Sequence, residues 1–273
     1  IIPNEICNQG DATPNLEYNQ LCPPYPSCIE NYVGEQNPCS CDVELNIVEL
    51  WGECYSSEYT TEINLYNSGL AGNIPPEIGQ LSNLTYLNLD FNELSGTIPP
   101  EIGNLTNLNR LQLMGNQITG TIPSEIGNLT KLTELFLDIN ELTGIIPPEL
   151  GNLTKLTHLS LGSNQLDGQI PLEIGSLTNL NSLWLCYNNL SGVIPDEICN
   201  QGDSTPNLAN NNLCGPYPDC GDGAITSEDE QDITSCSLCA SNEAEINGTC
   251  YDIQSTTNIS LSYCNWTEIP SEI

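Results

Sequence analysis

The sequence predicts a repeat solenoid of the α/β type, closed at its ends by disulfide-stapled caps. Two observations predict it. A 24-residue unit recurs six times over residues 63–198, and all fourteen cysteines fall outside residues 55–185. One such unit is too small to bury its own leucines, but stacked copies share a continuous core.

The repeat unit predicts the elements of each coil. Residues 87–99 read LNLDFNELSGTIP, and the units continue as PxEIGxLxxL. The LxL triplet predicts a short strand with alternate residues pointing inward, and six such strands should stack in parallel about 4.8 Å apart. The recurring glycine permits a backbone turn, and the Ile-Pro pair after it favours an extended run along the back.

This pattern resembles the plant-type leucine-rich repeat, LxxLxLxxNxLxGxIPxxIGxLxx, over about residues 60–198. The resemblance implies a right-handed superhelix with a parallel β-sheet on the concave face and 3-10 or extended segments on the convex side. It also implies a buried asparagine in each unit, which ties the turn after the strand to the neighbouring backbone. That column contains Asn92, Asn116, Asn140, Asn164 and Asn188, and the first unit has Ser68 instead.

The flanking segments predict caps arranged in tandem. Residues 29–62 are expected to form a linker and an N-terminal cap, residues 199–220 a C-terminal cap, and residues 221–235 an acidic linker. IIPNEICNQGDATPNL at 1–16 recurs as VIPDEICNQGDSTPNL at 193–208, so residues 1–28 should be the C-terminal cap of a preceding array. Residues 236–273 should be an N-terminal cap and the start of a following array. We therefore expect the chain to be a stretch of a longer array of arrays.

The clustered cysteines predict disulfides and therefore an extracellular or cell-surface location. The loop CGPYPDC favours a bridge between Cys214 and Cys220. Zinc on the CxxC pair of Cys236 and Cys239 is the alternative, but no second CxxC pair and no histidine lie near it in the sequence. The disulfide candidates are Cys22, Cys28, Cys41, Cys54, Cys186, Cys199, Cys214 and Cys220.

The charge balance narrows the choice of partners. Three basic residues face 36 acidic ones, for a net charge of −33. Nucleic acid is excluded as a partner because neutralising phosphates requires Lys and Arg. Membrane insertion is excluded because no apolar run approaches the roughly 20 residues of a spanning helix. The expected partners are copies of the chain or flanking segments of it, joined head to tail, and a protein or glycan ligand.

Rare residue types gather at the variable positions around LxL, where the resemblance implies that ligands bind. An aromatic and charged strip on a polar protein is typical of a binding face. Two alternatives stay open: the columns are simply unconstrained, or the face packs against a linker or a neighbouring protomer. The candidates are Tyr86, Phe91, Arg110, Met114, Glu134, Phe136, His158, Trp184 and Tyr187.

One column imitates a catalytic triad, because Glu134, His158 and Ser182 fall on neighbouring strands. A triad also needs a strained nucleophile turn, an oxyanion hole and a water-excluding pocket, which a regular strand face does not offer. The sequence therefore predicts a protein that is not an enzyme. Arg110, Glu134 and His158 are better interpreted as an exposed charge ladder of little stabilising value.

No cofactor or metal is predicted, although Ca²⁺ remains an alternative at two places. One is the stacked glutamates of PxEI, Glu77, Glu101, Glu125, Glu149, Glu173 and Glu197. The other is the loop 219–230, where Pro218 and Cys220 replace the first two acidic ligands, so a polar linker is favoured. N-linked glycans are predicted at the sequons of Asn83, Asn104, Asn128, Asn152, Asn189, Asn247, Asn258 and Asn265. The alternative is that GNLT is simply the sequence that this repeat family uses at that position.

Two functions fit these observations. The duplicated caps favour a non-enzymatic extracellular structural protein, whose tandem solenoids build a head-to-tail surface fibre or adhesive array. The alternative is a recognition module that binds a peptide, protein or glycan on its concave face. The resemblance implies this second function, since receptor ectodomains and polygalacturonase inhibitors share the repeat.

Overall fold

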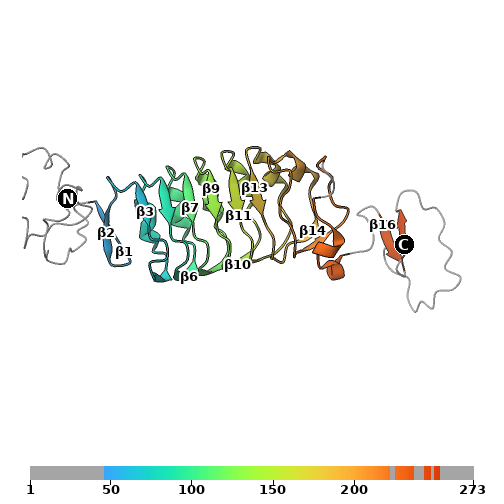
Figure 1. Cartoon of the computed structure of the whole chain (residues 1–273), viewed down its shortest axis with the longest axis horizontal. Coiled ribbons are helices and arrows are strands. Elements are labelled where there is room, and N and C mark those ends of the chain that lie inside the picture. The colour runs from blue at the N-terminus through green and yellow to red at the C-terminus, as the bar shows by residue number, and fades with distance from the viewer. Residues whose placement is uncertain (1–45, 222–224, 237–242, 247–248, 253–273) are drawn as a thin grey trace, which may run out of the picture.

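The computed structural model describes residues 46–221, 225–236, 243–246 and 249–252. The repeats form an elongated solenoid, in which the chain advances by one coil per unit along the long axis (Figure 1). Each coil contributes a strand to a first sheet, a strand to a second sheet and a 3-10 helix. The leucines and isoleucines between them form one continuous core.

The first sheet lies on the concave face and has six parallel strands, as predicted. Neighbouring strands pair in register at a spacing of one repeat, so Leu87 lies beside Leu111 and Leu111 beside Leu135. The central residue of each strand is buried, and its two neighbours face outward. In spatial order the strands are β3 (Glu62–Asn64), β5 (Tyr86–Asn88), β7 (Arg110–Gln112), β9 (Glu134–Phe136), β11 (His158–Ser160) and β13 (Ser182–Trp184).

A second parallel sheet follows the turn after each concave strand, and the sequence did not predict it. Its strands are only two to five residues long, and the glycine that was expected to make a turn lies within or beside them at positive φ. They are β4 (Ala71–Asn73), β6 (Glu93–Thr97), β8 (Gln117–Gly120), β10 (Glu141–Gly144) and β12 (Gln165–Leu166), and β14 (Ser191–Val193) pairs separately with β15 (Asn212–Cys214).

The convex side carries one 3-10 helix per coil, as predicted. A proline whose φ is near −65° precedes each helix and fixes its entry angle. The glycine of PxEIG is required by close packing: a Cβ on Gly103 would lie 2.5 Å from the carbonyl oxygen of Glu125 in the next coil. The helices are η4 (Pro76–Gln80), η5 (Pro100–Asn104), η6 (Ser124–Asn128), η7 (Pro148–Asn152), η8 (Leu172–Ser176) and η9 (Asp196–Asn200).

The predicted asparagine column is a hydrogen-bond ladder that joins the two sheets. Asn164 is representative: its Nδ2 donates to the carbonyl oxygens of Leu137 at 3.0 Å and Leu161 at 3.1 Å. Its Oδ1 accepts from the N–H of Leu142 at 3.0 Å. Leu137 and Leu161 follow concave strands, whereas Leu142 belongs to β10. The side-chain amide is therefore hydrogen-bonded through both its nitrogen and its oxygen, and it links one coil to the next.

A hairpin covers the N-terminal end of the array. Strands β1 (Ile47–Leu50) and β2 (Glu53–Ser56) are antiparallel, and Trp51 and Gly52 turn the chain with φ values of 51° and 84°. A second hairpin of the same kind, β16 (Glu243–Ile246) and β17 (Thr249–Asp252), occurs downstream. Its Cys250 lies opposite Glu245, as Cys54 lies opposite Glu49 in the first. The predicted preceding cap and following array lie outside the described residues.

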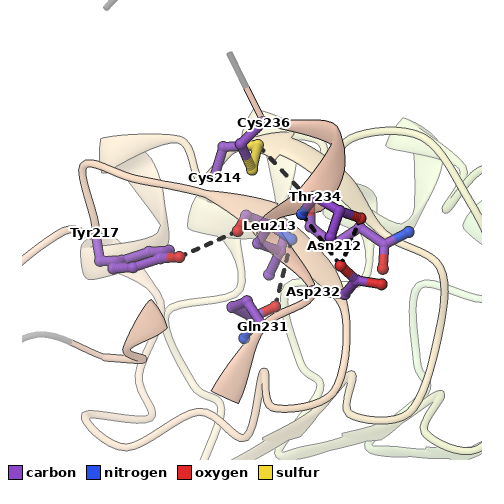
Figure 2. The surroundings of a disulfide bond; sticks show 8 residues. All are labelled: Asn212, Leu213, Cys214, Tyr217, Gln231, Asp232, Thr234 and Cys236. Carbon is purple, nitrogen blue, oxygen red and sulfur yellow. Dashed lines mark hydrogen bonds between the residues drawn. A yellow bond between two sulfur atoms is a disulfide. The ribbon is translucent and has the colours of Figure 1, made fainter. Parts of the chain in front are cut away.

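The C-terminal end continues the asparagine ladder by two further rungs. Asn211 repeats the pattern, and Gln231 completes it with a longer side chain. Gln231 Nε2 donates to the carbonyl oxygen of Leu208 at 3.0 Å. Its Oε1 accepts from the N–H of Leu213 at 3.3 Å, as Figure 2 shows. The short helices η10 (Glu228–Glu230) and η11 (Ile233–Ser235) flank this rung. The described part of the segment predicted as a linker at 221–235 thus packs on this end of the array through Gln231.

The cap disulfides differ from the predicted pairing. Cys199 is bonded to Cys220, and Cys214 is bonded to Cys236 (Figure 2). The predicted bridge between Cys214 and Cys220 is wrong, because Cys214 belongs to β15 and lies beside η11 in the folded cap. The Tyr217 hydroxyl holds the intervening loop by donating to the carbonyl oxygen of Leu213 at 3.1 Å.

The other cysteine predictions have mixed outcomes. Cys54 is disulfide-bonded. The prediction for Cys186 is wrong: it is a buried free thiol, and burial raises its pKa. Its Sγ fills the space beside Gly162, 3.2 Å from where a Cβ would lie. Cys22, Cys28 and Cys41 lie outside the described residues.

Candidate ligand-binding site

Each concave strand presents three outward positions, which form three rows across the sheet. The first and second rows flank the buried central leucine, and the third follows the next leucine. The first row is 62, 86, 110, 134, 158 and 182, the second is 64, 88, 112, 136, 160 and 184, and the third is 66, 90, 114, 138, 162 and 186. The chain then turns at a residue of positive φ, such as Phe91, Gly115, Ile139 or Tyr187.

A hollow of about 350 Å³ opens on this face over strands β7 to β13. It contains four of the predicted residues, Met114, Phe136, His158 and Trp184. The full lining is Asp90, Gln112, Met114, Phe136, Asp138, His158, Leu159, Ser160, Ser182 and Trp184.

Aromatic and thioether groups form the walls. The rings of Phe136 and His158 meet edge to face, with their centroids 6.3 Å apart and their planes at 63°. Trp184 stands half-exposed at 52% of its surface, although it is one of the largest apolar side chains of the face. An exposed indole beside a hollow offers a large contact area to a ligand.

Hydrogen bonding sets the orientation of His158. The Thr157 hydroxyl donates its single proton to the carbonyl oxygen of Thr133 at 2.9 Å. Its contact with His158 Nδ1 at 3.0 Å therefore requires Nδ1 to carry the proton. Nε2 of the neutral ring is then an acceptor, and it is free to meet a donor from a ligand.

Two carboxyl groups form the floor: Asp90 is buried, and Asp138 is partly buried. Asp90 is only 6% exposed, and its Oδ1 accepts from the N–H of Met114 at 2.7 Å. Burial raises the pKa of Asp90 to about 6; the Met114 hydrogen bond opposes this shift, and the charge of Asp138 adds to it. Burial also raises the pKa of Asp138, and the neighbouring Ser160 hydroxyl lowers it by less.

Two polar atoms of this floor are left without hydrogen bonds of normal geometry. Among the described residues, Asp138 Oδ1 and Ser160 Oγ are buried and make no hydrogen bond of normal geometry, although the Ser160 hydroxyl lies close enough to Asp138 to lower its pKa. Ser160 is 6% exposed, so bulk water does not reach its hydroxyl freely. Buried polar atoms are almost always paired, so this pair makes the floor of the hollow a candidate position for a polar group of a ligand.

The predicted charge ladder exists only in part, and it lies beside the hollow. Arg110 Nε is 3.2 Å from Glu134 Oε1, but the arginine side chain is 54% exposed, so the pair stabilises the fold little. Because His158 Nδ1 is bonded to Thr157, Glu134 does not orient the imidazole as the acid of a triad would. Tyr86 is occupied as well: its hydroxyl donates to Gln112 Oε1 at 3.0 Å.

Two predicted residues, Phe91 and Tyr187, do not line the hollow. Both occupy the turn beyond the third row, with φ values of 55° and 56°. Phe91 packs edge to face with Tyr66 at 5.6 Å and lies over Gly115. Four lining residues, Asp90, Gln112, Asp138 and Ser160, were not predicted from the sequence, although a count of outward positions past the second leucine would have included both aspartates.

For the predicted glycosylation sites, the structure shows only whether each asparagine is exposed and whether its side chain is already hydrogen-bonded. The sequon asparagines at 83, 104, 128, 152 and 189 are exposed, and those at 247, 258 and 265 lie outside the described residues. Asn83 is the least suitable acceptor, because its Nδ2 already donates to the carbonyl oxygens of Ser57 and Glu58. The part of the chain that the structure describes contains no group of three or more His, Cys, Asp or Glu residues placed to hold a metal ion. It also contains no helix that is long and apolar enough to cross a bilayer.

The chain belongs to the leucine-rich repeat proteins, because the family model "Leucine-rich repeat region" matches residues 66–202. The same coil occurs in solved plant structures. The plant peptide hormone receptor RGFR1, in complex with RGF2, is 44% identical over 53% of this chain and 23% of its own, with a TM-score of 0.52. The Arabidopsis receptor kinase HAESA, in complex with the peptide hormone IDA and the co-receptor SERK1, is 38% identical over 58% of this chain and 27% of its own, with a TM-score of 0.56.

A plant ice-binding protein is also similar, at 34% identity over 56% of this chain and 49% of its own, with a TM-score of 0.51. The chain thus spans about a quarter of the length of the two receptors and about half of the ice-binding protein. No curated protein sequence matches it. Since relatives of one fold bind such different partners, the fold alone does not select the ligand.

Proposed function

We propose that the protein is an extracellular, non-enzymatic recognition module that binds a peptide, or an extended loop of a partner protein, in the concave hollow. The observation that carries this proposal is the hollow itself. Its walls are apolar, its floor holds unpartnered buried polar atoms, and a half-exposed tryptophan stands beside it. Binding sites characteristically combine apolar walls with a few fixed polar groups.

The comparisons support the same function. Two of the similar receptors were solved with peptide hormones bound. The two cap disulfides favour an oxidising, extracytoplasmic compartment. An extended peptide also suits the geometry, because the hollow crosses several parallel strands and not a single coil.

A random peptide library displayed on phage tests this function directly. Peptides selected on the immobilised wild-type protein should lose at least tenfold in affinity on Trp184→Ala, because that indole supplies exposed contact area without being needed by the core. Leu172→Ala is the matched control, since Leu172 is 57% exposed in η8 on the convex side. Equal loss in both variants, or no selected peptide that depends on Trp184, would refute binding in the hollow.

Assembly into a tandem surface array is the second candidate. The supporting observation is the β16–β17 hairpin, which repeats the register of the β1–β2 cap beyond the C-terminal cap of the same array. Electron microscopy of native material tests this candidate. A regular axial repeat along filaments would support the fibre, whereas separate short arcs would refute it. Because residues 225–236 already cover the C-terminal end, any head-to-tail contact must involve other surfaces.

A further inference from the structure

The floor of the hollow contains more hydrogen-bond acceptors than donors, since the Ser160 hydroxyl is the only described side-chain donor that lies close to the Asp138 carboxyl group. Asp138 Oδ1 and Ser160 Oγ are buried and unpartnered among the described residues, and the Asp90 carboxyl lies in the same lining. An ionised carboxylate can only accept hydrogen bonds, and a serine oxygen accepts as readily as it donates. A ligand group that satisfies this floor must therefore bring N–H or O–H donors.

The electrostatic balance selects a positively charged donor. Asp90 is buried and Asp138 is partly buried here, no described lysine or arginine lines the hollow, and Arg110 is paired with Glu134. An unpaired buried carboxylate is costly, and a hydrogen-bonded cation offsets that cost. The net charge of −33 also attracts basic partners over a longer range.

The walls favour an organic cation over a metal ion. Calcium prefers six to eight oxygen ligands, whereas much of this lining is Met114, Phe136, Leu159 and Trp184. A lysine or arginine side chain has an apolar stem that would lie against such walls. Its charged end would reach the carboxyl group, with the aromatic faces adding cation–π attraction.

We propose that the hollow binds one basic side chain, a lysine or an arginine, of a peptide ligand, and that Asp138 and Ser160 accept hydrogen bonds from its charged end. This inference rests on the proposed peptide-binding function. In this arrangement Asp90 supplies a second negative charge two coils away, and His158 Nε2 provides a further acceptor at the rim. Specificity for a basic side chain would come from its hydrogen bonds to Asp138 and Ser160, since an apolar side chain would leave both groups without these bonds.

Peptides selected from the phage library test the proposal without altering the protein. Each selected peptide is resynthesised with every lysine and arginine replaced, one at a time, by norleucine, which keeps the apolar stem and removes the charge. One replacement should lower affinity for the wild-type protein at least tenfold, as measured by titration calorimetry. Exchanging lysine and arginine at that position shows which of the two ions fits.

Protein variants then locate the contact. Asp138→Asn keeps the shape and removes the charge, and it should erase the difference between the basic and the norleucine peptide. Glu141→Gln is the matched control, because it removes the same charge from an exposed position in β10 of the same coil. Ser160→Ala should reduce the difference in part. Thermal unfolding shows whether each variant keeps the fold.

These experiments distinguish failure of the cation site from failure of the peptide-binding function. If peptides bind in a Trp184-dependent way but lack an essential basic residue, the cation site is overturned and the peptide-binding function stands. If Asp138→Asn and Glu141→Gln have equal effects, the cation site is likewise overturned. If no peptide depends on Trp184, both proposals fail.

Discussion

The two sheets of the solenoid share one repeat and one parallel register, yet their outward faces are built differently. On the second sheet, the residue after each positive-φ glycine packs over the corresponding glycine of the next coil. Thr97 thus covers Gly120, Thr121 covers Gly144 and Ile145 covers Gly168. On the concave sheet, the outward rows leave a hollow with unpartnered acceptors.

This difference separates the part of the chain that is complete by itself from the part that is not. The outward face of the second sheet is packed by its own side chains, since a side chain of each coil fills the space above the glycine of the next coil. The concave sheet keeps exposed aromatic area and buried charge that the fold does not need. Changes to the shared framework should therefore lower stability, whereas changes to the hollow should lower binding and leave stability unchanged or higher.

The largest loss of stability is expected where one side chain joins the two sheets. Asn164→Ala removes the donors to Leu137 and Leu161 and the acceptor of the Leu142 N–H. Leaving these buried backbone groups unpaired should lower the free energy of unfolding by about 3–4 kcal/mol. Chemical denaturation measures it. A loss below 1 kcal/mol would mean that water enters the ladder and replaces the amide.

A smaller loss is expected within the second sheet. Gly144→Ala places a Cβ 2.9 Å from Thr121 Cγ2 at a φ of +74°, so backbone strain and a clash add to about 2 kcal/mol. Gly72→Ala separates the two terms, because at φ +83° its Cβ would meet nothing within 4 Å and only the strain of about 1 kcal/mol remains. Equal losses in denaturant would refute the stacking of one coil on the next. Neither variant should change peptide affinity.

A substitution in the hollow is expected to raise the free energy of unfolding, whereas those in the framework lower it. The folded-state pKa of Asp90 is raised to about 6, so the folded protein holds this proton more tightly than the unfolded chain does. Asp90 therefore costs no stability below about pH 4, its cost grows between about pH 4 and 6, and the full cost is present above the folded-state pKa of about 6. Asp90→Asn should raise the free energy of unfolding by about 1–2 kcal/mol at pH 7.5, after discounting for partial solvent access. The gain should vanish near pH 4.

The control for this titration is Asp167→Asn, an exposed aspartate beside the second sheet, which should change little at either pH. The charged groups that share the hollow with Asp90 are Asp138 and His158. An ionised Asp90 attracts a basic ligand, so binding of a basic peptide should strengthen as pH rises through the Asp90 pKa of about 6. If Asp90→Asn stabilises the protein and also weakens a basic peptide, the charge is retained for binding at the expense of the fold.

How far the sequence predicted these regions depends on how periodic each one is. The concave strands, the asparagine ladder and the convex 3-10 helices follow from columns that repeat every 24 residues. The second sheet was missed because its strands are short and carry a positive-φ glycine, which breaks the alternation by which strands are recognised. The pairing of Cys214 with Cys236 was missed because it depends on how the non-repeating cap folds, and sequence spacing does not encode that.

In the hollow, too, the sequence predicted some residues and not others. Met114, Phe136, His158 and Trp184 were found because they are rare types in variable columns. Asp90 and Asp138 were not, because an aspartate after a leucine looks ordinary until its burial and missing partner are seen. Phe91 lies outside the lining of the hollow, because the chain has already turned to positive φ one residue past the third row, where strand alternation no longer applies.

The smallest expected effect concerns that turn, at the edge where the two sheets part. Ile139 has a φ of 55° and is 51% exposed, an unfavourable conformation for a β-branched residue. Ile139→Asn keeps the backbone bond to the Gly162 carbonyl and tolerates positive φ, so it should stabilise the protein by about 1 kcal/mol. Ile145→Asn, at a similarly exposed position of the second sheet that lacks positive φ, should not stabilise. If both variants behave alike in denaturant, the turn is unstrained. If only Ile139→Asn stabilises, then the strain lies directly beside Asp138, and the concave edge carries it together with the buried charge.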